Sequence, residues 1–265
     1  MTERRDSFRP RKRLGQHFLV DPNTVRRIVA EVEAPVGAQV VEIGPGRGAL
    51  TTDLHNLYPD MIAVEVDPRS VALLTEKYPD LDIREMDVLK VDWRRLVGDP
   101  PRPVVVVGNL PYNITSQILF SLLESGCVSR AILTMQREVA ERLVAVPRTK
   151  EYGILSVIVQ LITIPSIRFH LSPNVFYPKP EVWSSTVRLE WPPENETTAA
   201  AQSEFLRRLV RAAFNQRRKM LRNSLSSFVD EAGRSLPDWV GMKRAEELTP
   251  SEFLRLADDL SSDSE

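Results

Sequence analysis

The sequence predicts a mostly parallel, doubly wound α/β domain followed by a small all-helical domain, and three observations support this prediction. Strand-like and helix-like segments alternate over the first two-thirds of the 265 residues, as in a parallel sheet with crossover helices. Four consecutive valines at positions 104–107 suit a strand that is buried on both faces. After Trp191 the apolar residues follow helical spacing only. We therefore expect two domains, at residues 1–191 and 192–265.

The first domain is expected to open with a helix, because Asp21 can cap it and Pro22 fits its first turn. A further helix, Ser70–Lys77, follows a start of the same kind at Asp67-Pro68. Short apolar runs predict strands between and after these helices: Gln39–Ile43, Met61–Val66, Val104–Val107, Ala131–Met135 and Ile154–Ile164.

The second domain is expected to follow a polar, proline-containing linker at residues 191–198. Near its end, Thr249, Pro250 and Glu252 form the pattern of a capping box with proline at the first helical position. The apolar residues that follow this pattern are therefore predicted to be helical.

The composition is that of an ordinary globular protein. Hydrophobic residues make up 42% and charged residues 27%, which excludes disordered and fibrous classes. No apolar run approaches the roughly 20 residues of a membrane span, and the basic N-terminus lacks the apolar stretch of a secretory signal. The single cysteine, Cys127, excludes a disulfide framework, and no Cys/His spacing suits a metal. We expect a cytoplasmic protein with neither a metal nor a membrane partner.

Charge is distributed unevenly along the chain, although the formal net charge is only −1. Residues 205–222 hold seven basic side chains and no acidic one, so pairs one helical turn apart cannot neutralise them. A second basic cluster lies at residues 3–13, and we expect the acidic tail, residues 246–265, to face solvent. Because screening makes phosphate binding depend on local clusters of charge, we predict that residues 205–222 bind nucleic acid. The candidate contacts are Arg217, Arg218, Lys219 and Arg222.

A glycine-rich loop follows the first predicted strand, with glycines at positions 44, 46 and 48 that allow a positive φ and a close approach of a ligand. Glu65 ends the next predicted strand, 21 residues after Gly44, where a carboxylate can accept ribose hydroxyls. This combination predicts an adenosine-containing cofactor, either NAD or S-adenosylmethionine. The spacing G-x-G-x-G differs from the G-x-G-x-x-G of dinucleotide sites. As a solvent-facing ribose contact, Glu65 is expected to contribute little to stability.

The segment Asn109-Leu110-Pro111-Tyr112 follows the valine strand, at the end where α/β sheets place their ligands. Pro111 biases Leu110 toward an extended backbone, which can aim the Leu110 carbonyl into the cleft. The side-chain oxygen of Asn109 adds a second acceptor and Tyr112 adds an aromatic face. Two acceptors beside a ring suit a planar base with an exocyclic amine, although four residues alone fit a turn with a buried tyrosine equally well.

These segments resemble, in the same order, the motifs of the S-adenosylmethionine-dependent rRNA adenine dimethyltransferases. That family includes the small-subunit dimethyladenosine transferases and the macrolide-resistance methyltransferases. The resemblance runs from about residue 11 to residue 260 and rests on seven segments: Leu14–Leu19 (LGQHFL), Glu42–Thr51 (EIGPGRGALT), Ala63–Asp67 (AVEVD), Met86–Leu89 (MDVL), Asn109–Thr115 (NLPYNIT), Asn174–Val182 (NVFYPKPEV) and Phe214–Leu221 (FNQRRKML).

The resemblance implies a Rossmann-like class I methyltransferase domain that uses S-adenosylmethionine. The implied reaction is dimethylation of the exocyclic amines of two adjacent adenosines in small-subunit rRNA, during ribosome biogenesis. Cofactor contacts are implied for His17, Leu19, Gly44, Glu65, Asp87 and Asn109. The target adenine would be held by the acceptors of Asn109 and Leu110 and stacked on Tyr112 and Phe176. We expect a monomer whose partner is rRNA in the small subunit or its precursor.

The chain departs from the family pattern at three places. His17 stands where many relatives have asparagine, and Glu181 and Trp183 stand where relatives often carry lysine and a small polar residue. Three alternatives remain open: a large-subunit rRNA adenine methyltransferase conferring macrolide resistance, a non-catalytic RNA-binding assembly factor with the same fold, and an NAD-dependent oxidoreductase. The glycine spacing disfavours the last, and the intact Glu65 and Asp87 disfavour the assembly factor.

Overall fold

The computed structural model describes residues 10–11, 14–98, 102–192, 203–231 and 233–261. The chain forms two compact units: Met1–Ala140 with Ser166–Glu190, and Glu141–Pro165 with Trp191–Glu265. The predicted boundary at residue 191 differs from this division, because residues 141–165 group with the C-terminal helices. Among the described residues, no helix is long and apolar enough to cross a membrane. Most of the basic cluster at residues 3–13 and of the expected linker lies outside the described residues.

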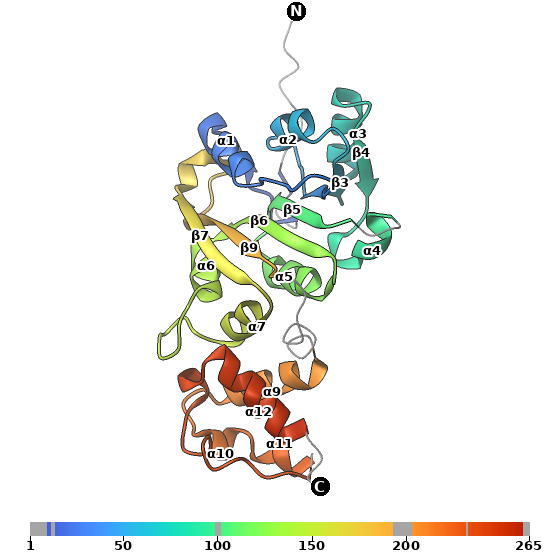
Figure 1. The fold of residues 1–265 in the computed structure, drawn as a ribbon. Helices are drawn as coiled ribbons and strands as arrows, with labels where there is room; N and C mark the ends of the chain where they lie inside the picture. Colours follow the sequence, from blue (N-terminus) through green and yellow to red (C-terminus); the bar gives the residue numbers. More distant parts are fainter. Residues whose placement is uncertain (1–9, 12–13, 99–101, 193–202, 232, 262–265) are drawn as a thin grey trace, which may run out of the picture. The chain divides into compact units, whose positions relative to one another are not determined.

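The first unit is built on a seven-stranded sheet with strand order β4-β3-β2-β5-β6-β9-β7 (Figure 1). The strand pairs from β4 to β6 are parallel, and β9 runs antiparallel to β6. The mostly parallel α/β sheet predicted from the sequence is therefore confirmed. Its strands are β2 (Gln39–Ile43), β3 (Ile62–Glu65), β4 (Asp82–Glu85), β5 (Val104–Asn109), β6 (Val128–Gln136), β7 (Ile164–Leu171) and β9 (Ser184–Glu190).

The central strand of this sheet, β5, is buried by helices packed against it. All of Val104–Val107 are fully buried, as expected for a strand covered on both faces. Val105 and Val107 belong to an apolar cluster that also contains Ile28 from α1 and Leu54 from α2. Asp21 caps α1 as predicted, accepting from the main-chain N–H of Thr24. The helices along this part of the chain are α1 (Pro22–Ala30), α2 (Thr51–Leu57), α3 (Pro68–Lys77), α4 (Trp93–Leu96), α5 (Thr115–Glu124) and α6 (Arg137–Leu143).

A two-stranded sheet joins two segments that are far apart in the sequence. β1 (Phe18–Leu19) pairs antiparallel with β8 (Phe176–Tyr177), with Leu19 opposite Phe176. A 3₁₀ turn, η3 (Pro173–Val175), leads into β8. This pairing fixes the N-terminal segment against the 174–182 segment, and both were singled out by motif.

The second unit is helical, and one of its helices corrects a prediction. Residues 154–162 form the helix α7 (Ile154–Ile162), not the strand expected for Ile154–Ile164. A short apolar run rich in β-branched residues fits a buried helix as well as a strand. Two polar residues four positions apart lie on one helix face: Ser156 donates to the Arg142 carbonyl and Gln160 donates to the Leu143 and Ala145 carbonyls.

The C-terminal helices are α9 (Glu204–Asn215), α10 (Leu221–Ser224), α11 (Ser226–Glu231) and α12 (Pro250–Ser261), with the 3₁₀ turn η4 (Ala245–Glu247). α7, α9 and α12 pack on one another, and the Phe214 ring lies between Tyr152 and Phe253. The predicted capping box is present, because the Thr249 main-chain N–H donates to Glu252 and the Glu252 N–H donates to the Thr249 hydroxyl.

Candidate active site

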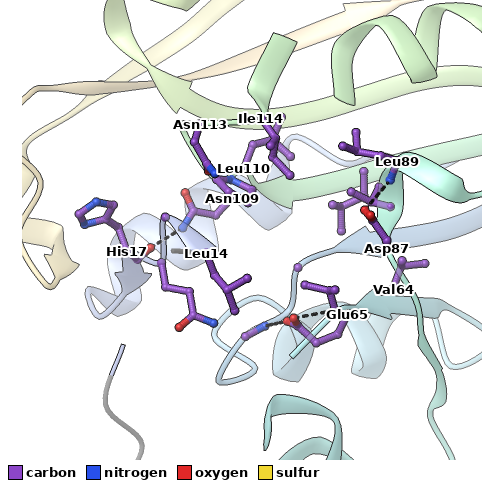
Figure 2. Close-up of a pocket in the computed structure, with 18 of the residues that line it drawn as sticks. Leu14, His17, Val64, Glu65, Asp87, Leu89, Asn109, Leu110, Asn113 and Ile114 are labelled. Carbon is purple, nitrogen blue, oxygen red and sulfur yellow. Dashed lines mark hydrogen bonds between the residues drawn. The ribbon is translucent and has the colours of Figure 1, made fainter. Parts of the chain in front are cut away.

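A pocket lies where the carboxyl ends of β2, β3 and β5 meet, in the first unit (Figure 2). Strand order runs from β2 toward β4 in one direction and from β5 toward β6 in the other, so the pocket sits where the order reverses. Its volume is about 270 Å³, and residues 14–18 of the N-terminal segment line one side. Four residues predicted from motifs line it together: Gly44, Glu65, Asp87 and Asn109.

The glycine loop after β2 adopts left-handed backbone conformations. Gly44 has φ 62° and Gly46 has φ 57°, a region that favours glycine. A Cβ atom at Gly46 would stand 2.8 Å from the Phe18 ring, so this position admits no larger residue without movement. Gly44 lines the pocket, and a Cβ atom there would meet no protein atom within 4 Å. The two glycines therefore serve different ends: Gly46 allows close packing and Gly44 leaves space for a ligand.

Glu65 ends β3 and is buried, in contrast to the solvent-facing contact expected from the sequence. Only 5% of the Glu65 surface is exposed to solvent. One oxygen accepts from the main-chain N–H groups of Val66 and Asp67, both at 2.8 Å, and the other accepts from Gly46 at 3.0 Å. Burial raises the pKa of this carboxyl, and the three N–H groups act against that rise. About one of its four lone-pair positions remains for a ligand hydroxyl unless the Gly46 contact gives way.

Asp87 follows β4 and combines a structural contact with a place in the pocket. One carboxylate oxygen, Oδ1, caps the 3₁₀ turn η2 (Val88–Lys90) by accepting from the Leu89 N–H at 3.0 Å. The residue lines the pocket, as do Met86 and Val88, and Figure 2 shows Asp87 beside Leu89. The cap fixes the orientation of the carboxylate, and Oδ2 is the oxygen that takes no part in it.

Asn109 ends β5, and its amide has one fixed orientation. The side-chain Nδ2 donates to the main-chain oxygen of His17 at 2.7 Å (Figure 2). A carbonyl oxygen can only accept, so the amide nitrogen faces His17 and the Asn109 Oδ1 faces away. Among the described residues Oδ1 is buried and has no hydrogen-bond partner. An unpaired buried acceptor costs about 1–3 kcal/mol, and in a pocket wall it is a position for a ligand donor.

Neither of the two aromatic residues expected to stack on the target base is part of the pocket lining. Tyr112 is half-buried, its hydroxyl hydrogen-bonds the Ser184 hydroxyl at 2.6 Å, and burial raises its pKa, so the phenol stays neutral. Phe176 is only 3% exposed and belongs to the apolar cluster beneath the sheet, so its side chain is not part of the pocket lining. Leu110 lines the pocket, and its N–H is bound to the Thr134 carbonyl.

The two N-terminal residues expected to contact a cofactor also separate. Leu19 is buried in β1 opposite Phe176 and does not line the pocket. His17 lines it, but its ring is engaged elsewhere: Nδ1 lies 2.7 Å from the Pro178 carbonyl, and the ring stacks on Tyr112.

Sequence reasoning missed a network of polar side chains beside Glu65. Asp67, predicted only as a helix cap, accepts from Gln16 Nε2 at 3.1 Å and lies 3.5 Å from the Arg11 guanidinium. The Arg69 guanidinium beside Asp67 lowers the pKa of that carboxyl to about 2. The Arg11 main-chain N–H donates to Gln16, which completes the link. An Asp-Pro helix start gives no sign of such additional partners.

In the second unit, the predicted nucleic-acid contacts fall into two groups. Arg217 donates to the main-chain oxygens of Thr149 and Lys150 and to the Glu246 carboxylate, each at 2.7 Å. Each of its three guanidinium nitrogens thereby donates a hydrogen bond within the chain, so Arg217 has a structural role. Arg218, Lys219 and Arg222 are exposed.

The predicted acidic tail is not simply a solvent-facing segment. Glu246 binds Arg217, and Glu252 binds Lys243 at 2.9 Å. Asp259 accepts from the Trp239 indole N–H at 3.0 Å. These acidic side chains thus have partners within the chain while remaining partly exposed, and residues 262–265 lie outside the described residues. Within the described ranges, no three His, Cys, Asp or Glu side chains are grouped so that they could hold a metal ion.

A family model described as ribosomal RNA adenine dimethylase matches residues 7–261. The chain belongs to this family. The ribosomal RNA small subunit methyltransferase A of Salinibacter ruber is 48% identical over 256 residues, covering 96% of this chain and 86% of that protein. The protein of the same name from Pseudomonas putida is 40% identical and covers 96% of each chain.

Solved structures agree with the fold. The crystal structure of a dimethyladenosine transferase from Plasmodium falciparum matches with a TM-score of 0.75 at 23% identity, covering 91% of this chain and 96% of that one. The 23S rRNA methyltransferase ErmE matches with a TM-score of 0.66 at 28% identity, covering 92% and 100%. The rRNA adenine dimethylase family confirms the expected enzyme class, an rRNA adenine dimethyltransferase, and the Rossmann-like fold. It gives no support to the NAD-dependent oxidoreductase alternative.

Proposed function

We propose that this chain transfers methyl groups from S-adenosylmethionine to the N6 amines of two adjacent adenosines in small-subunit rRNA, in the cytoplasm, during ribosome biogenesis. The observation that supports it most directly is the Asn109 Oδ1 atom, a buried acceptor without a partner at the carboxyl end of β5. An adenine amine carries two N–H donors and needs such an acceptor. The small-subunit relatives at 48% and 40% identity favour this substrate over large-subunit rRNA.

The pocket fits an adenosine-containing methyl donor on three independent grounds. The empty position beside Gly44 offers room against the backbone, and the Glu65 carboxylate offers an acceptor for a ribose hydroxyl. Asp87, oriented by its cap, offers an acceptor for a 6-amino group. When bound, the cofactor supplies an electrophilic methyl group on a sulfonium centre. We propose Gly44, Glu65, Asp87 and Asn109 as the residues that hold it.

The remaining chemistry falls to the residues that hold the target base. An adenine amine is a poor nucleophile because its lone pair is delocalised into the ring. Asn109 Oδ1 and the Leu110 carbonyl are proposed to accept its N–H groups, which lets the nitrogen pyramidalise and directs its lone pair at the methyl group. The Tyr112 ring is proposed to stack on the flipped base and offset a few kcal/mol of unstacking. Positioning and electrostatics then supply the rate, and the proton leaves to water.

The proposed RNA contacts lie in the second unit, on Arg218, Lys219 and Arg222, which are exposed cations that can neutralise phosphates. Phe176 remains a proposed stacking partner only if its buried ring turns outward when RNA binds, since it is 3% exposed here.

The deciding experiment is methylation of small subunits that lack the modification, with a labelled methyl donor and mass mapping of the product. Dimethylation at two adjacent adenosines of the small-subunit rRNA is the expected result. Label in large-subunit rRNA alone would support the macrolide-resistance alternative, and binding of the subunit without transfer would support the assembly-factor alternative.

A further inference from the structure

The His17 side chain has two partners in the first unit, and both belong to segments proposed to hold the target base. Its Nδ1 atom lies 2.7 Å from the Pro178 carbonyl oxygen, in the 174–182 segment. Its ring stacks on Tyr112 with centroids 5.2 Å apart and planes inclined by 23°. Figure 2 shows the ring turned away from Leu14 and Glu65, the side on which a cofactor ribose would lie.

These contacts determine how the imidazole is held. The Pro178 oxygen can only accept, so the Nδ1 atom of His17 carries a proton. The ring cannot turn about its Cβ–Cγ bond without losing the hydrogen bond to the Pro178 carbonyl. The geometry is that of an offset aromatic pair, which is worth more than the area it buries.

Tyr112 is held at two points as a result. Its hydroxyl is tied to Ser184 at the start of β9, at 2.6 Å, and one face of its ring is covered by His17. A ring has two faces, so only the face away from His17 remains for a base to stack on.

We propose that His17 is a positioning residue for the target adenine: its imidazole, anchored on Pro178, backs one face of Tyr112 and presents the other face to the base. The proposal rests on the role assigned to Tyr112 under the proposed function. It reassigns the side chain of His17 from the cofactor to the target site. The main-chain oxygen of His17 keeps a separate task, since it orients the Asn109 amide whatever side chain stands at position 17.

The test separates the ring of His17 from its hydrogen bond. His17→Asn keeps an N–H donor near the position of Nδ1 but removes the ring, and His17→Phe keeps the ring but removes the donor. Each change is made in the wild-type chain and in Tyr112→Ala, and single-turnover methylation of small subunits is measured with saturating cofactor and subunit. Cofactor affinity by calorimetry and thermal unfolding are measured for every variant.

We expect His17→Asn to slow the single-turnover rate about 3- to 10-fold, the loss of one aromatic pair, with cofactor affinity unchanged. In the Tyr112→Ala background the same change should have no further effect, because the partner through which it acts is gone. The single-turnover rate should fall less in His17→Phe than in His17→Asn, because the phenylalanine keeps a ring against Tyr112. A fluorescent 2-aminopurine can replace the target base. Its fluorescence should be quenched less by the His17→Asn protein than by the wild-type protein, because its stacking on Tyr112 is weakened.

Two outcomes overturn the proposal. One is a His17→Asn variant that slows methylation equally in both backgrounds. The other is weaker cofactor binding with an unchanged rate at saturation, which would show that the His17 side chain contacts the cofactor. If His17→Asn unfolds at the assay temperature, the comparison of His17→Phe in the two backgrounds decides in the same way. A Tyr112→Ala protein with a wild-type rate would instead overturn the proposed target site itself.

Discussion

The Asn109 amide donates through Nδ2 to the main-chain oxygen of His17 at 2.7 Å, and this bond determines which amide atom faces the pocket. The N-terminal segment thus sets the orientation of a residue 92 positions later in the chain. The acceptor Oδ1 is left buried and unpaired among the described residues, at a cost that a ligand donor in the pocket can recover. Such a site suits a ligand group that brings a hydrogen-bond donor.

Stability should fall as the pH rises through the neutral range, because of Glu42. This residue is 1% exposed in β2, and burial raises its pKa to about 8, opposed by the Thr51 hydroxyl that donates to it at 2.7 Å. Its ordinary pKa is 4.5. Between these two values the folded chain holds a proton that the unfolded chain has lost, so unfolding free energy falls by up to about 1.4 kcal/mol per pH unit.

Glu42→Gln should remove that dependence, because glutamine keeps the Thr51 contact and never ionises. Urea unfolding of both proteins at several pH values between 5 and 8 measures the difference. The free energy of unfolding of the variant, relative to that of the wild-type protein, should increase steadily as the pH rises. A difference between the two that stays constant across this range would show that Glu42 does not titrate there.

Glu65→Ala should weaken cofactor binding and also destabilise the fold, by roughly 2 kcal/mol or more. The alanine leaves the N–H groups of Gly46, Val66 and Asp67 without their carboxylate acceptor. Glu65→Gln keeps one oxygen acceptor and should be less destabilised, while still binding the cofactor more weakly. Glu85, opposite Glu65 on the neighbouring strand and exposed, gives the control: Glu85→Ala should change neither quantity. Calorimetry with S-adenosylmethionine and thermal unfolding are the measurements, and an unchanged cofactor affinity in Glu65→Gln would contradict a ribose contact.

The basic segment should separate into a structural residue and a binding pair. Replacing Arg218 and Lys219 with alanine should weaken small-subunit binding and lower its dependence on salt by about one to two ions, with thermal stability unchanged. Arg217→Ala should do the reverse and destabilise the chain by roughly 1–3 kcal/mol, because the guanidinium holds Thr149, Lys150 and Glu246 together. Binding measured over a range of salt concentrations, beside thermal unfolding, checks both. A salt dependence that the double variant leaves intact would remove these residues from the RNA interface.

The strand ends of the site were predictable from the sequence. Gly44, Glu65, Asp87 and Asn109 each follow or end an apolar run, and the carboxyl ends of parallel strands meet at one edge. Their side-chain partners were not predictable in this way. Glu65 is held by main-chain N–H groups of the turn that follows it, and the course of that turn cannot be inferred from residue spacing or composition.

Two features that the sequence does not reveal have a common physical origin. A run such as Ile154–Ile162 is apolar enough to be buried in either secondary structure, and only Ser156 and Gln160, satisfied four residues apart, mark the helix. Arg217 stands in a run of cations, but a charge pattern in sequence does not reveal the main-chain carbonyls that tertiary structure brings to one guanidinium. Both depend on contacts with residues distant in the chain.

Asn109→Ala separates catalysis from binding. It removes the Oδ1 acceptor and leaves Gly44, Glu65 and Asp87 in place, so single-turnover methylation should fall about 10²- to 10³-fold, which corresponds to about 3–4 kcal/mol of transition-state stabilisation. Small-subunit binding should change little, because contacts to phosphates elsewhere dominate affinity. The fold should tolerate the change, since removal of an unpaired buried acceptor offsets part of the lost hydrogen bond between Nδ2 and the His17 carbonyl.

Asn109→Asp provides the matched control for geometry. Aspartate keeps an acceptor toward the pocket but replaces the Nδ2 donor with an oxygen facing the His17 carbonyl, so two acceptors would confront each other. We therefore expect partial activity together with lower thermal stability, in contrast to the inactive but stable alanine variant. Assays at saturating cofactor and subunit remove binding differences from both comparisons. A near-normal single-turnover rate in Asn109→Ala would mean that the unpaired oxygen has no part in methyl transfer, and the target amine would then have to be held elsewhere in the pocket.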